Sequence, residues 1–167
     1  DSTYSGGTTV SAGSVLVGNN AAFGTGLVTL GTGVTVSSNG VAGAGDRTIG
    51  NGISVSGGVT LGSATNTGVL TFGGAGALTG NTTLTLLSGV VMGGILSGAY
   101  TLTKAGTGAL TLSGANTYSG GTTVSAGSVL VGNDGALGTG VVTVSGGTVS
   151  SDGTSARTLA NGISLGA

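Results

Sequence analysis

One stretch of this chain occurs twice without a single change, and it restricts the fold more than any other feature. The two copies are residues 3–19 and 117–133, which are identical over 17 residues and lie 114 positions apart. A long identity at a fixed separation indicates a repeat architecture. Each copy contains two short runs, Thr-Thr-Val and Ser-Val-Leu-Val, around a Gly-containing corner. Such short β-branched and aliphatic runs are typical of strands, and the corners are too short for helices.

The similarity between the two halves extends beyond the identical stretch. The longer copies are residues 3–55 and 117–165, and the offset between them drifts from 114 to 110 positions. Candidate strands recur about every eight residues, and no segment has helical periodicity. We therefore expect a single domain over residues 1–167, with loops of variable length between its units.

Strands this short are not stable as isolated hairpins, but they become stable when coils stack and each strand pairs with the coils above and below. Glycine, which supplies 40 of the 167 residues, permits corners with positive φ. The sequence predicts an all-β fold, a parallel β-helix (β-solenoid) of about seven turns without helices. A β-sandwich is the alternative, in which Asn39-Gly40, Asn51-Gly52 and Asn161-Gly162 would form hairpin turns.

Side chains should alternate between the inside and the outside of each coil. In the run at 128–131, either Val129 and Val131 or Leu130 points inward. The identical run at 14–17 should follow the same rule.

A longer motif covers residues 102–132 and reads L-T-K-x-G-x-G-x-L-T-L-S-G-x-N-T-Y-S-G-G-T-T-V-x-x-G-S-x-L-V-G. It resembles the autotransporter-associated β-strand repeat of passenger domains in bacterial secreted and surface proteins. Its second half recurs at the N-terminus, and the rest of the chain is similar to this family in composition and rhythm. The resemblance implies a right-handed parallel β-helix in an extracellular or cell-surface setting, and it names no catalytic residues.

Ionisable side chains are scarce, with three cations, four acidic residues and a net charge of −1. Three cations do not form a nucleic-acid-binding surface. The apolar runs are too short to span a bilayer as a helix. Without Cys, the chain forms no disulfides and no thiolate metal sites.

The residue types needed for catalysis are also missing. The chain has no His, Cys or Glu, so nucleophile–base pairs built on His or Cys are absent. Polysaccharide lyases are similar in fold but require clustered acids and bases, whereas Asp134 and Asp152 sit in separate Gly-flanked turns. We expect no enzymatic activity, no cofactor and no metal site.

Three kinds of residue are weak candidates for binding. Asp46, after Gly45, could belong to a calcium-binding turn, but a turn aspartate paired with Arg47 is the simpler interpretation. Tyr4 and Tyr118 occupy equivalent repeat positions and could stack on carbohydrate, although a corner aromatic packed on the neighbouring turn is simpler. Lys104 is interpreted as a solvated corner charge.

Threonines raise a further possibility. Thr83 and Thr85 on one strand, and Thr101 and Thr103 on another, have the spacing of an ice-binding array on a flat solenoid face. Most other strands carry one Thr or none in this arrangement, which argues against ice binding.

Two functions from different classes fit this sequence. The first is a structural element, a rigid extracellular rod, stalk or filament. The second is the passenger domain of an autotransporter-type adhesin that binds a host or glycan surface. The regularity of the chain and the lack of a concentrated polar or aromatic patch favour the first.

The two termini of the chain match an internal turn. Leu165-Gly166-Ala167 followed by Asp1-Ser2-Thr3-Tyr4 imitates residues 112–118. Either the chain is a segment of a longer repeat protein with flanking repeats, or subunits stack head-to-tail into a homopolymer. About seven turns of roughly 4.8 Å predict an axial rise near 34 Å for each subunit. The candidate joint residues are Asp1, Ser2, Thr3, Tyr4, Leu165, Gly166 and Ala167.

Overall fold

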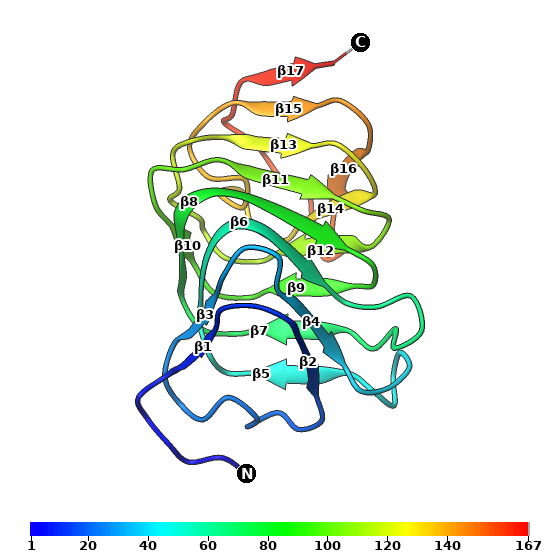
Figure 1. Cartoon of the computed structure of the whole chain (residues 1–167). Helices are drawn as coiled ribbons and strands as arrows, with labels where there is room; N and C mark the ends of the chain where they lie inside the picture. The colour runs from blue at the N-terminus through cyan, green and yellow to red at the C-terminus, as the bar shows by residue number, and fades with distance from the viewer. Residues whose placement is uncertain (167) are drawn as a thin grey trace.

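The computed structural model of the chain describes residues 1–166 and contains, over that range, 17 strands and no helix. Ala167, one of the expected joint residues, lies outside the described residues. Eight strands form the main path of the larger sheet (Figure 1). They are β1 (Thr8–Val10), β3 (Val28–Leu30), β6 (Ile53–Leu61), β8 (Gly76–Leu86), β11 (Leu102–Ala105), β13 (Thr122–Val124), β15 (Val142–Val144) and β17 (Ile163–Leu165).

The remaining strands complete two sheets. Three of them join the main path to make an 11-stranded sheet: β2 (Ser14–Val17), β4 (Thr35–Ser38) and β10 (Leu96–Ser97). The other six form the second sheet: β5 (Arg47–Ile49), β7 (Leu70–Phe72), β9 (Val90–Met92), β12 (Ala109–Leu112), β14 (Ser128–Val131) and β16 (Thr148–Ser151).

Every strand pairing is parallel and joins one coil to the next, so the molecule is a β-solenoid. In the upper half one coil takes 20 residues, because Leu102 pairs with Thr122 and Thr122 with Val142. The number of coils is about eight, one more than the sequence predicted. As the chain rises in Figure 1, the near strands β11, β13 and β15 point right and the far strands β5, β7 and β9 point left, which is the right-handed sense.

The core consists of mostly aliphatic side chains that stack in columns through the coils. Val129 and Val131 are buried, while Leu130 between them is partly exposed. The alternation prediction is therefore confirmed, with the valines inside. In the identical N-terminal run, Val17 is buried and Leu16 is exposed. Burial of each such side chain stabilises the fold by about 1.5–3 kcal/mol.

The repeat and the coil have different lengths, and this moves the two identical copies onto different sides of the solenoid. From Thr8 the column of paired residues climbs through Val28 and Ile53 to Gly76 and Leu96. In the next coil this column continues near Asn116, because the Thr117 N–H donates to the Leu96 carbonyl (2.9 Å).

The identical Thr122 lies instead in the column of Leu102, Thr82 and Gly57. β1 of the N-terminal copy therefore lies on the side where β6 begins, whereas β13, its counterpart in the internal copy, lies on the side where β6 ends. β6 and β8 are long because each crosses both sides (Figure 1). The 114-residue offset is thus five coils plus roughly one further side.

Candidate functional site

Lys104 is buried in the core, and the expectation of a solvated corner charge is wrong. It lies two residues after the buried Leu102 on β11, so alternation points both side chains inward. Its column neighbours are Leu84 below and Val124 above. The Nζ atom donates hydrogen bonds to the carbonyls of Ala105 (2.9 Å), Gly106 (2.8 Å) and Ala126 (3.1 Å). Burial lowers the pKa of Lys104 to about 8.

Glycine is required where the coil above closes over this ammonium group. Gly127 has a φ of +68°, and a Cβ placed on it would lie 2.5 Å from the Gly106 carbonyl oxygen and 2.9 Å from Lys104 Nζ. A side chain would therefore collide with both the backbone and the cation below. The Lys and Gly residues of the motif thus form one structural unit spanning two coils.

Tyr118 fills a corner of the core in the internal copy. Its side chain is 0% exposed, and its hydroxyl shares a 2.6 Å hydrogen bond with Thr122 Oγ1, which donates to the Leu137 carbonyl (3.0 Å). Burial raises the pKa of Tyr118 to about 12. A Cβ on Gly138 would lie 2.8 Å from the ring. Tyr118 is thus a corner aromatic packed on the next coil, and it is not available for carbohydrate stacking.

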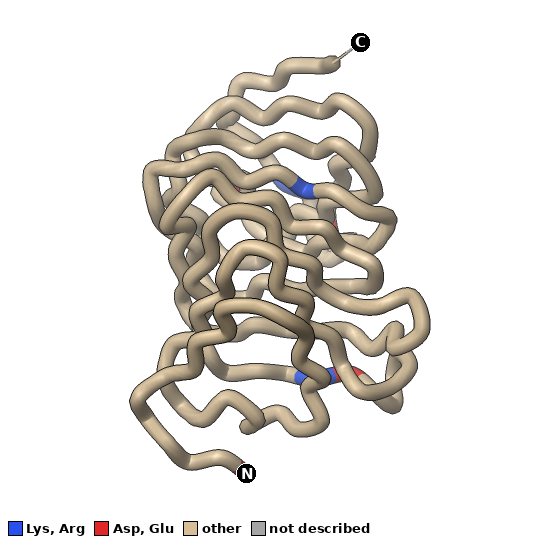
Figure 2. The backbone as a smooth tube through the Cα atoms, in the orientation of Figure 1, with Lys and Arg blue, Asp and Glu red and all other residues tan. Residues whose placement is uncertain are grey.

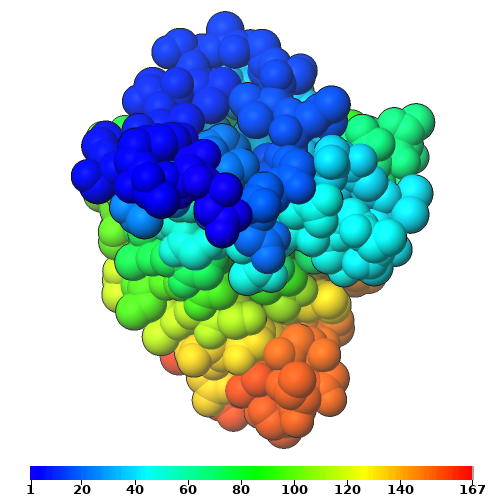
Figure 3. All heavy atoms as spheres, turned by 90° about the horizontal axis from the view of Figure 1, so that it is seen from below, coloured from blue at the N-terminus to red at the C-terminus, as the bar shows by residue number. Residues whose placement is uncertain are grey.

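Tyr4 makes the same local contact at an open end. Its hydroxyl lies 2.6 Å from Thr8 Oγ1, yet the residue is 46% exposed. Leu16 is 63% exposed, and nothing lies within 4 Å of a Cβ built on Gly13. The N-terminal copy has the same internal bonds as the internal copy but no coil beneath it within the described residues. Figure 3 views this open end from below.

Asparagine side chains join neighbouring coils, a role that the sequence analysis did not predict. Asn116 accepts from the Leu96 N–H (2.7 Å) and donates to the Ala136 carbonyl (2.6 Å). Asn161 donates to the carbonyls of Gly138 (3.0 Å) and Gly140 (2.8 Å). Asn51 makes the equivalent bonds in the first copy. Asn51-Gly52 and Asn161-Gly162 are therefore coil corners and not the hairpin turns of a sandwich.

The acidic residues act within turns. Asp46 Oδ1 accepts from the N–H groups of Val69 (2.8 Å) and Gly43 (3.0 Å), and these hydrogen bonds hold its pKa below the usual value. Its carboxylate is thus held by backbone donors. Within residues 1–166 no group of three or more acidic, His or Cys ligands is found. Charges are few and dispersed along the chain (Figure 2).

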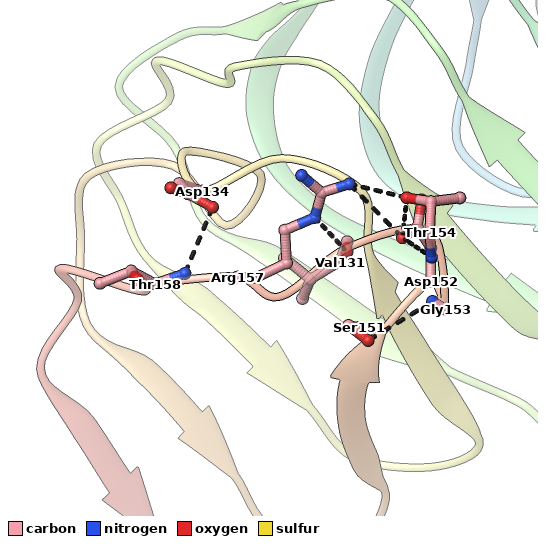
Figure 4. A network of polar contacts seen from close by, with 8 residues as sticks. All are labelled: Val131, Asp134, Ser151, Asp152, Gly153, Thr154, Arg157 and Thr158. Atoms are coloured by element: carbon pink, nitrogen blue, oxygen red, sulfur yellow. Dashed lines mark hydrogen bonds and ion pairs between the residues drawn. The ribbon is translucent and has the colours of Figure 1, made fainter.

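A second polar network ties the loop after β16 to β14 (Figure 4). Arg157 forms a 3.5 Å ion pair with Asp152 and donates to the Val131 carbonyl (3.3 Å). Asp152 also accepts from the N–H (3.1 Å) and hydroxyl (2.7 Å) of Thr154, which keep its pKa below the usual value. Asp134 accepts from the Thr158 N–H (3.2 Å). The network fastens the loop after β16 to the neighbouring coil.

The threonines form a ladder on the outer surface. Thr83, Thr103, Thr123 and Thr143 pair across four successive coils, each partly exposed. The neighbouring column is mixed, because Thr85 pairs with Ala105. Stacked Thr side chains stabilise a sheet as cross-strand neighbours. The outer surface thus carries one regular column of threonines beside a column of mixed residues.

Recesses on the surface are shallow and lie at the corners. One recess of about 420 Å³ at the lower end is lined by Asp1, residues 18–21 and Arg47. Two smaller ones, about 320 and 270 Å³, occupy equivalent repeat positions beside Asn51 and Asn161. Glycine, alanine, threonine and asparagine residues make up most of the lining of the two smaller recesses, which offers a few amide and backbone groups for hydrogen bonds.

The candidate joint residues lie at opposite ends of the solenoid (Figure 1). Asp1, Ser2, Thr3 and Tyr4 precede β1 at the lower end. Leu165 ends β17 at the upper end and is 77% exposed, and Gly166 follows it. Within the described residues, β1 and β17 are the two ends of the main strand path. Both edges therefore present unpaired backbone groups. No helix in the described residues could span a membrane.

Comparison with known proteins supports the resemblance seen in the motif. Searches of curated proteins and of solved structures found no match. The family model described as passenger-associated-transport-repeat matches residues 1–17 and 102–131. The first segment covers most of the N-terminal copy, and the second covers the Lys104 coil and most of the internal copy. The expected resemblance to the autotransporter-associated repeat is therefore confirmed over these two segments.

Proposed function

We propose that this solenoid is a structural rod element that works outside the cell and lengthens by stacking further β-coils on its open edges. The observation that carries the proposal is a continuous apolar core through about eight coils, which ends at each end of the described residues in an edge strand that is paired on one side only. The match to the passenger-associated-transport-repeat supports a secreted or surface-exposed setting.

Copies of the chain itself can extend the rod by stacking head-to-tail. The upper edge strand β17 lies in the column of Thr122 and Val142, which continues down to Gly57 in the second half of β6. β2 reaches the same side through β4 and the end of β6. A second copy placed above, without rotation, sets its β2 over β17. Such a contact is heterologous and does not close, so it generates a fibre.

Electron microscopy of purified protein tests this proposal. About eight coils of roughly 4.8 Å predict an axial rise near 38 Å per copy, replacing the 34 Å expected from seven turns. Filaments of the parent protein with that repeat support stacking between copies. The substitution Leu165→Lys at the upper edge should then make the filaments shorter. Dispersed particles at high concentration contradict it.

The adhesin function is the second candidate. Tyr100 is 42% exposed between β10 and β11, on the wall of the solenoid and away from both ends. Aromatic rings with one free face suit carbohydrate stacking. Display of the chain on cells, with glycan and host-surface attachment scored for the parent and for Tyr100→Ser, tests this function. Attachment that survives Tyr100→Ser excludes the ring as the contact.

A further inference from the structure

The internal copy shows which kind of coil fits beneath this repeated sequence. β13 pairs along its lower edge with β11, and β14 pairs with β12. The Ser125 N–H and hydroxyl both donate to the Lys104 carbonyl (2.9 Å each). The Gly132 N–H donates to the Leu112 carbonyl (2.8 Å). The coil below thus supplies two strands and a lysine that reaches the Ala126 carbonyl from beneath.

The N-terminal copy carries the same receiving groups in the same local structure. Ser11, Ala12, Gly13 and Gly18 stand at the positions of Ser125, Ala126, Gly127 and Gly132. Gly13 has a φ of +85°, so the corner is already formed, but no atom of the described residues lies within 4 Å of a Cβ built on it. Within the described residues β1 pairs with β3 and β2 with β4, both on the upper side. This edge is therefore preformed for a coil beneath it.

We infer that the β1–β2 edge is a docking surface for a β-coil of the L-T-K-x-G-x-G-x-L-T-L type, whose lysine ammonium group binds the Ala12 carbonyl beneath Gly13. The inference rests on the proposed function, in which further coils stack on the open edges. The lower edge is thereby selective for one type of coil, the type that carries this lysine. The chain contains a single lysine, Lys104, which is buried internally. The upper edge of a second copy therefore docks here without this cation and is the weaker occupant.

An extended chain tests the inference directly. Residues 1–2 are replaced by a copy of residues 97–116, which restores ahead of Thr3 the 20 residues that precede Thr117. One matched control carries methionine in place of the lysine in the added coil, and a second carries a Gly-Ser segment of equal length. Hydrogen exchange of the Ser11 and Gly18 amides is measured in dilute monomeric samples. Exchange of the Thr122 amide in the same samples verifies that the parent solenoid is folded.

We expect the added coil to slow exchange at Ser11 and Gly18 at least about tenfold relative to the Gly-Ser control, because both amides gain carbonyl acceptors. The methionine control should lose most of that protection at Ser11, beside the lysine site. Equal protection in the lysine and methionine chains overturns the lysine selectivity. Unchanged exchange in the lysine chain overturns docking altogether. Neither result bears on whether unmodified copies form filaments, which microscopy decides separately.

Discussion

The identical segments at 3–19 and 117–133 offer a comparison in which sequence is constant and only surroundings differ. Tyr118 is 0% exposed, whereas Tyr4, with the same 2.6 Å hydroxyl contact, is 46% exposed. Local sequence thus determines the corner and its hydrogen bond. Burial comes from neighbouring coils, because a solenoid is stabilised by interfaces between successive repeats. The same mutation in each copy therefore separates local from stacking contributions.

Truncation of the two tyrosines should give the largest difference. Tyr118→Ala removes a buried ring and leaves a cavity, so we expect a loss of about 4 kcal/mol in the free energy of unfolding. Tyr4→Ala at the open end should cost about 1 kcal/mol. Urea unfolding of dilute monomer measures both. Equal losses would mean that the corner hydrogen bond, and not stacking, stabilises this position.

Alanine substitutions at the two corner glycines should show the second-largest difference in the free energy of unfolding. Both Gly13 and Gly127 have positive φ, which costs an alanine about 1–2 kcal/mol at either site. At Gly127 the new Cβ also overlaps the Gly106 carbonyl, which adds about 1–3 kcal/mol of overpacking. Thermal unfolding of Gly13→Ala and Gly127→Ala compares the two positions. A Gly13→Ala variant as unstable as Gly127→Ala would show that the open corner is already crowded.

The equivalent valines of the two copies, Val15 and Val129, test the same difference within the core. Val129→Ala should cost about 2 kcal/mol, since the side chain is fully buried and its removal leaves a cavity. Val15→Ala, at a partly buried position, should cost about half as much. Denaturant midpoints of the two variants test the ratio. A larger loss for Val15→Ala would contradict a weaker first coil.

Much of this architecture was predictable from the residues. Short β-branched runs and glycine corners predicted the solenoid, and alternation predicted the inward valines. The predicted number of turns was one too low because some sides of the coils have no strand-like sequence pattern. β10, for example, has only two residues, Leu96–Ser97. Loop insertions also conceal the coil length, since Val28 and Ile53 are paired although they lie 25 positions apart.

The candidate site was less predictable, and Lys104 shows why. A lone lysine usually lies in solvent, because its charge is costly to bury without partners. The signal that favoured burial was its position two residues after Leu102 in a strand with one inward face. The carbonyls that satisfy it come from corners in two coils, 105–106 and 126. The sequence alone does not show that these two corners lie close together in space.

Removal of the cation should have a smaller effect than removal of the ring. Lys104→Met keeps the buried stem but leaves the Ala126 carbonyl without its ammonium donor. An unsatisfied buried acceptor costs about 1–3 kcal/mol, and the gain from no longer burying a charge offsets part of it. We expect a net loss of about 1 kcal/mol, measured by urea unfolding. A variant more stable than the parent would show that the lysine is retained for a reason other than stability.

The dependence of stability on pH should differ between the acid range, where the aspartates titrate, and the alkaline range, where Lys104 and Tyr118 of the motif titrate. Between acid and neutral pH the change should be small, because only Asp46, which is exposed, and Asp152, which is partly exposed, have lowered pKa values. Their contribution is present above pH 4 and is lost as the pH falls through their folded values.

Alkaline pH should act in two opposite steps. The pKa of Lys104 is lowered from 10.5 to about 8, so between these values the unfolded chain binds more protons and stability rises with pH. The pKa of Tyr118 is raised from 10.0 to about 12, so above pH 10 the folded chain binds more protons and stability falls. Urea midpoints from pH 7 to 12 should therefore pass through a maximum near pH 10. Lys104→Met should abolish the rise and keep the fall, whereas Tyr118→Phe should do the reverse. A monotonic fall in the parent would mean that the three carbonyls hold the ammonium group protonated despite its burial.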